Sequence, residues 1–159
     1  MLLTIGAMVL LSTIMLRVNT VNFNSDSIRA EAQYGMLATS IATSIIEEAK
    51  GLAFDENTDT ISVSNINDLT SAAALGKESG ETYETFNDFD DFDGYTKTDT
   101  TLHSAIFNIK CKVDYVDPSN INVPSFSNTW HKKITVLVSS PSMRDTIRES
   151  SIYSYWYFR

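Results

Sequence analysis

The densest cluster of chemically active side chains is one short acidic segment. It holds four aspartates: Asp88, Asp90, Asp91 and Asp93. Carboxylates next to a glycine turn, here Gly94, are the ligands that calcium prefers in proteins. The spacing of an EF-hand loop fails, because Phe89 would occupy the first ligand position and Thr100 the bidentate one. The segment therefore either binds calcium or forms a solvated turn anchored by its aromatic residues, and the sequence favours the turn.

The carboxy-terminal segment IYSYWYFR carries aromatic residues on two alternating faces. In a strand, one face would hold four residues: Ile152, Ser154, Trp156 and Phe158. The opposite face would hold three tyrosines: Tyr153, Tyr155 and Tyr157. We expect the first face to lie in the core and the tyrosines to contact a neighbouring subunit.

Cysteine and histidine usage excludes several kinds of site. Cys111 is the only cysteine, so the chain has no intrachain disulfide and no cysteine-based metal site. Its place in an alternating strand predicts a buried structural thiol. The two histidines, His103 and His131, are far apart and lack the spacing of zinc ligands. No nucleophile-elbow, phosphate-binding or HExxH pattern is present, so we expect no enzyme and no cofactor other than calcium. The net charge of −8 argues against nucleic acid and anionic lipid headgroups as partners.

These residues must be positioned by a chain that begins with an apolar segment, residues 1–16, without a charge before Arg17. At about 1.5 Å per residue a helix here would be ~24 Å long, somewhat shorter than the ~30 Å hydrocarbon core of a bilayer. No basic residue precedes it and no small-x-small cleavage site follows it, so a secretory signal peptide fits poorly. We expect a retained membrane helix that later forms a filament core through nine residues: Leu2, Leu3, Ile5, Gly6, Val9, Leu10, Leu11, Ile14 and Leu16.

A second helix is predicted over residues 27–50, with Ser25 or Asp26 as its N-cap and Gly51 just past its end. Residues 17–24 mix β-branched residues with three asparagines, which predicts a weakened, bent or partly extended stretch. The stretch contains no proline that would break the helix, so a continuous helix is the alternative. Residues 1–52 thus form an amino-terminal anchor and stalk.

The remaining residues, 53–159, are expected to form a globular head. Residues 53–101 have weak periodicity and should be mostly loop, with a short strand over 60–64 and a short helix over 66–75. Alternation is clear from residue 105, and three strands are expected over 105–116, 131–139 and 146–157. A long helix packed on this antiparallel meander, residues 105–157, is an α+β fold.

This arrangement resembles the type IV pilins and pseudopilins, in which an apolar amino-terminal helix anchors the subunit and then forms the filament core. The resemblance covers the whole chain and is architectural. The chain departs from the family in having Ile5 where a glutamate is usual, no acidic residue before Asp26, no stalk proline and no carboxy-terminal disulfide. The resemblance implies that a prepilin peptidase has removed a leader.

Two functions follow as hypotheses. In the first, the chain is a structural subunit of an extracellular or periplasmic helical filament, held in the inner membrane before assembly and built from copies of itself by assembly machinery. In the second, it is a single-pass membrane-anchored extracytoplasmic binding module whose acidic loop holds calcium or a partner. The first is favoured by residues that permit close helix approach in the anchor: Thr4, Gly6, Ala7, Ser12 and Thr13.

Overall fold

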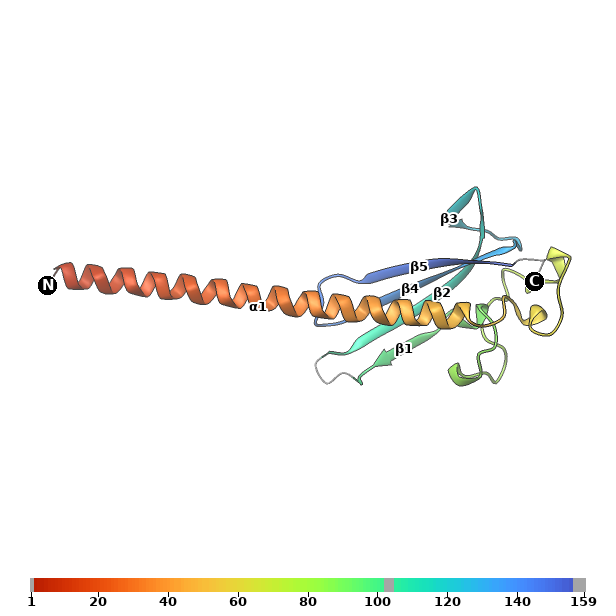
Figure 1. Cartoon of the computed structure of the whole chain (residues 1–159), viewed down its shortest axis with the longest axis horizontal. Coiled ribbons are helices and arrows are strands. Elements are labelled where there is room, and N and C mark those ends of the chain that lie inside the picture. Colours follow the sequence, from red (N-terminus) through yellow and green to blue (C-terminus); the bar gives the residue numbers. More distant parts are fainter. Residues whose placement is uncertain (1, 102–104, 156–159) are drawn as a thin grey trace.

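The computed structural model describes residues 2–101 and 105–155, and it shows one very long helix beside a twisted sheet (Figure 1). Helix α1 runs without interruption from Leu2 to Lys50. Its second half lies along the sheet, whereas its first half projects away from the rest of the chain (Figure 1). The fold is α+β, as the sequence predicts.

The sheet is antiparallel throughout. Its strands are β1 (Thr96–Asp99), β2 (Phe107–Asp117), β3 (Asn120–Pro124), β4 (His131–Ser139) and β5 (Ile147–Ser154). The order in space is β1-β2-β4-β5, and β3 pairs separately with the end of β2. The two longest ladders, β2 with β4 and β4 with β5, form the centre against which α1 packs.

The core lies between the second half of α1 and the inner face of the sheet. From the helix it takes five buried residues: Ala38, Ala42, Ile45, Ile46 and Ala49. From the sheet it takes alternate residues of β2 and β4, including Val113, Ile134 and Val136. The three alanines carry no side chain beyond Cβ, so the helix backbone can approach the strands closely. A second cluster forms beyond the end of α1, around Phe54, Val63, Leu69 and Tyr115.

The expectation of a weakened stretch over residues 17–24 is wrong, because the structure is helical throughout this region. Ser25 and Asp26 therefore lie inside the helix and do not cap it. The physical reason is that asparagine and valine cost at most about 0.7 kcal/mol each in a helix interior, and no proline removes a hydrogen bond.

The loop region also differs from the sequence expectations. Residues 60–64 form no strand, and only Ile66–Asp68 of the expected helix is helical, as a 3-10 turn. Further 3-10 turns cover Glu56–Thr58, Tyr83–Thr85 and Asp90–Phe92. Strands β1 and β3 were not expected from the sequence, because their residues are almost all exposed and lack a buried face that would produce alternation.

Candidate functional site

The first half of α1 exposes apolar side chains on every side. All residues from 4 to 29 are exposed within the chain. Among the residues predicted to form the filament core, six have large exposed side chains: Ile5, Val9, Leu10, Leu11, Ile14 and Leu16. Leu2 and Leu3 belong to the same helix, and a Cβ added at Gly6 would meet no atom within 4 Å. A helix that is apolar all round must be covered by lipid or by other helices.

The apolar character continues past the first charge, Arg17. Val18, Val21, Phe23 and Ile28 are 55%, 65%, 70% and 65% exposed. Residues 17–29 extend the free helix by about 20 Å, at about 1.5 Å per residue. Helix α1 is long and apolar enough to cross a membrane. A hydrocarbon core of about 30 Å spans about 20 helical residues, so a bilayer that covers residues 1–20 leaves Val21, Phe23 and Ile28 outside it.

A row of these side chains has the spacing of a helix-packing seam. Leu11, Ile14, Val18, Val21 and Ile28 follow alternating intervals of three and four residues, interrupted by Ser25. This is the interval at which apolar residues of one helix face a partner helix. Phe23 lies off this row, so more than one neighbour is needed to cover the helix.

The acidic segment is not the solvated turn that the sequence favours. Asp88, Asp90 and Asp91 are buried, and Asp93 is half-buried. Two of them cap the turn that contains them: Asp88 Oδ1 accepts from the backbone N–H groups of Asp90 and Asp91, and Asp91 Oδ2 accepts from those of Asn87 and Asp88. Their burial therefore follows from local hydrogen bonds that the spacing of the residues did not reveal.

The other two aspartates of the candidate calcium site, Asp93 and Asp90, form ion pairs with two different lysines. Asp93 Oδ1 accepts from Lys112 Nζ and from the Val113 N–H, each at 2.9 Å. Asp90 forms a short ion pair with Lys132. Burial and the neighbouring Asp90 raise the pKa of Asp88 to about 8. The four carboxylates are thus divided among separate partners.

A different acidic group comes together at the same turn. One carboxylate oxygen from each of Glu78, Glu81 and Asp91 lies within 4.8 Å of the other two. Asp91 Oδ1 is buried and has no hydrogen-bond partner. Burial and the nearby Glu81 raise the pKa of Glu78 to about 7. A calcium ion contacts oxygens at about 2.4 Å, so three oxygens at these separations can share one ion.

A buried charged cluster, which was not expected from the sequence, lies beyond the end of α1. Lys132 of β4 is 0% exposed, and its Nζ donates to Asp55 Oδ2 at 2.7 Å, to the Phe54 carbonyl at 2.8 Å and to Asp90. Asp55 also accepts hydrogen bonds from Thr70. The alternation of β4 could have revealed this lysine, because Lys132 falls on the same face of the strand as Ile134, Val136 and Val138, which is the inner face.

The strand that carries the predicted tyrosine contacts has its faces reversed. Tyr153 and Tyr155 pack against Phe54 of their own chain, with ring centroids 5.7 and 5.5 Å apart, whereas Ile152 is exposed. Tyr153 pairs with the buried Lys132 in the β4–β5 ladder, which fixes it on the inner side. Alternation alone does not say which face is buried, and this explains the error. Tyr157 lies outside the described residues.

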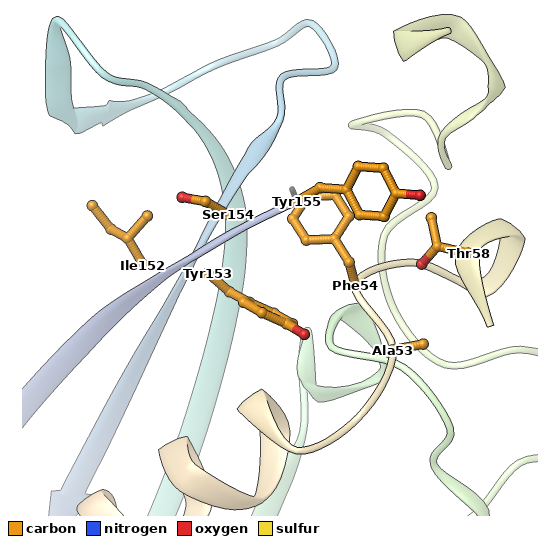
Figure 2. Close-up of a pocket in the computed structure, with 7 residues that line it drawn as sticks. All are labelled: Ala53, Phe54, Thr58, Ile152, Tyr153, Ser154 and Tyr155. Atoms are coloured by element: carbon orange, nitrogen blue, oxygen red, sulfur yellow. The ribbon is translucent and has the colours of Figure 1, made fainter. Parts of the chain in front are cut away.

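These tyrosines line a pocket at the end of the head (Figure 2). Its volume is about 410 Å³, and its walls come from the segment after α1 and from the end of β5. Its lining comprises Ala53, Phe54, Thr58, Ile152, Tyr153, Ser154 and Tyr155.

Cys111 is buried on the inner face of β2, as the sequence predicts. Burial raises the pKa of its thiol to about 12, so the reactive thiolate is scarce at neutral pH.

No protein-family model, curated protein or solved structure matches the chain, and the geometry of these sites is therefore the basis for inferring a function.

Proposed function

We propose that the chain is a structural subunit of an extracellular or periplasmic helical filament, assembled with copies of itself through the first half of α1. The same helix holds the subunit in the membrane before assembly machinery extracts it. In the assembled filament, the α1 helices form the centre and the heads face outward at the cell surface.

The observation that carries this proposal is the apolar surface beyond the charge-free segment. Val18, Val21, Phe23 and Ile28 are exposed in the isolated chain and lie after Arg17. A solitary anchor would leave Val21, Phe23 and Ile28 in water, at a cost of about 25 cal/mol for each Å² of apolar surface. Packing against α1 of one neighbouring copy buries Val18, Val21 and Ile28 along the same row as Leu11 and Ile14, and a second neighbour covers Phe23.

The absence of bulk at Gly6 and Ala7 supports the same arrangement. Both lie in the charge-free part of α1, and a Cβ at Gly6 would meet open space within the chain. Small residues let helices approach closely where apolar burial alone gives no preference for protein over lipid. The free half of α1 thus carries both close-approach positions and an apolar seam.

Electron microscopy of appendages sheared from producing cells, with mass spectrometry of their main band, tests this function. Val21→Asp places a carboxylate in the seam and should abolish filaments while the head still folds. Asn19→Asp is the matched control, because it changes a position that is already polar and lies off the seam. Filaments of normal abundance from the Val21→Asp strain would overturn the proposal.

A second candidate function is a membrane-anchored extracytoplasmic module that binds calcium, and the Glu78, Glu81 and Asp91 cluster favours it. Calcium should raise the thermal midpoint of the detergent-purified chain. At a hundredfold excess of calcium over Kd, the gain in the free energy of unfolding is about 2.7 kcal/mol. Glu81→Gln should remove this response, and Glu84→Gln, at an exposed residue outside the cluster, should keep it. Equal midpoints with calcium and with chelator would contradict calcium binding.

A further inference from the structure

The buried lysine cluster contains the groups needed for an internal covalent bond. Lys132, Asp55 and Asp90 are 0%, 0% and 1% exposed. Both carboxylates contact the same Nζ, at 2.7 Å for Asp55 and in a shorter contact for Asp90. The three residues come from β4, the segment after α1 and the Asp90–Phe92 turn, so only the folded chain brings them together.

Aromatic rings exclude water from the nitrogen. Lys132 Nζ lies 4.7 Å from the ring centroid of Phe54 and 5.3 Å from that of Tyr115. In such a site an ion pair is poorly solvated, which favours neutral products over separated charges. Two carboxylates also face one ammonium here, so the cluster carries an unbalanced negative charge.

The two aspartates are not equivalent. Asp55 accepts hydrogen bonds from the backbone of Asn57, from the backbone and hydroxyl of Thr70, and from the hydroxyl of Tyr115. It therefore keeps its partners if Lys132 is no longer a cation. Asp90 has the Lys132 ammonium as its cationic partner and lies beside Asp88, a second carboxylate.

We propose that Lys132 and Asp90 condense into an intramolecular isopeptide bond, with Asp55 as the group that carries the proton. Asp55 takes a proton from Nζ, and the freed nitrogen lone pair attacks Cγ of Asp90. The N–C bond forms, and one C–O bond of Asp90 breaks. Of the three ammonium hydrogens, one stays on the amide and two leave with the departing oxygen as water. The ammonium and one carboxylate charge cancel, so no oxidant or activated co-substrate is needed.

The product ties β4 covalently to the Asp90–Phe92 turn. The bond would span 42 residues of a chain whose single cysteine cannot form an internal disulfide. The remaining amide N–H can donate to Asp55, which keeps its four other donors. This inference does not depend on filament assembly, because every participant lies in the head of one chain.

Mass spectrometry of the full chain, purified in detergent and then denatured, tests the bond. We expect a mass lower than that of the sequence by one water. Trypsin should leave the chain uncleaved after Lys132 and should release residues 78–97 joined to residues 113–133. The full sequence mass together with cleavage after Lys132 would overturn the proposal. A water loss located at Asp93 and Gly94 would also overturn it, because an Asp-Gly succinimide has the same mass change.

Variants assign the roles. Asp90→Ala and Asp55→Ala should both have their full sequence masses, because the first lacks the acyl group and the second lacks the proton carrier. Asp59→Ala, at an exposed aspartate near Asp55, should still lose one water. A linked peptide from Asp55→Ala would contradict the role of Asp55. The measurement on the unchanged chain decides the main question even if a variant fails to fold.

Discussion

Lys132 Nζ lies 2.7 Å from Asp55 Oδ2, although the two residues are 77 positions apart in the sequence. This contact joins the central strand β4 to the segment that leaves α1. Both side chains are 0% exposed, so the ion pair holds the segment after α1 against the inner face of the sheet.

Lys132→Met should destabilise the chain by at least about 3 kcal/mol, because it leaves Asp55 and Asp90 buried with neither the lysine ammonium nor an amide bond to it. Denaturant unfolding followed by fluorescence measures the loss. Lys133→Met is the matched control, since Lys133 points to the outer face and donates to the Ile121 carbonyl. It should change stability by less than about 0.5–1 kcal/mol. Equal losses in the two variants would show that the buried cluster contributes little.

Asp88→Asn should make the head more stable at pH 8 and flatten its pH dependence. Burial and Asp90 raise the pKa of Asp88 to about 8, so the folded chain binds a proton that the unfolded chain has released. Because the pKa of Asp88 is higher in the folded chain than in the unfolded chain, the stability that its protonation contributes is fully present below about pH 4. This contribution is lost as the pH rises towards 8. The Asn Oδ1 can keep the bonds from the Asp90 and Asp91 N–H groups. Melting temperatures of both chains at pH 5 and pH 8 check this, and a variant as pH-dependent as the unchanged chain would contradict it.

Ala42→Leu should destabilise the head by about 1–3 kcal/mol, because Ala42 is 0% exposed where α1 meets the sheet and a larger side chain must displace its buried neighbours. Ser44→Leu, on the exposed side of the same helix, should change stability little. Thermal unfolding of the two variants compares them. An unchanged midpoint for Ala42→Leu would indicate a looser helix–sheet contact than the structure has.

Residues 27–159 should form a soluble, folded monomer rich in antiparallel sheet. The described buried core begins at Ala38, so removal of the first 26 residues leaves these contacts intact. Circular dichroism and gel filtration measure the outcome. A disordered chain would mean that the head folds only against neighbouring subunits.

The long elements of the fold were predictable because each has a strong periodic pattern. Alternation in β2 and β4 predicted strands close to those observed, and the apolar and small residues of α1 predicted the helix that covers them. The exposed strands β1 and β3 were not predictable, because their residues meet no core that would impose a pattern. The 3-10 turns were not predictable, because three residues are too few to show a period. The buried face of a strand was harder to predict than the strand itself. Tyr153 packs inward and Ile152 is exposed, the reverse of the prediction, because nothing in the local sequence distinguishes the two faces of β5.

The site was less predictable than the fold. The apolar half of α1 was evident from composition, whereas the partners of Lys132 depend on which loops cross the end of the sheet. The acidic segment shows the same limit. Its aspartates suggested one cluster, but in the structure Asp90 pairs with Lys132 and Asp93 pairs with Lys112. Asp91 lies close to Glu78 and Glu81 instead.

Thiol cross-linking in producing cells tests directly whether α1 packs against α1 of other copies. Val18→Cys and Val21→Cys place a thiol in the seam, and the native Cys111 is buried and poorly reactive, so the unchanged chain serves as the control. If the α1 helices pack together, both seam variants should give covalent dimers under mild oxidation or with a short bifunctional thiol reagent, and the unchanged chain should give monomers. Monomers alone from Val18→Cys and Val21→Cys, with the protein present at the cell surface, would contradict it.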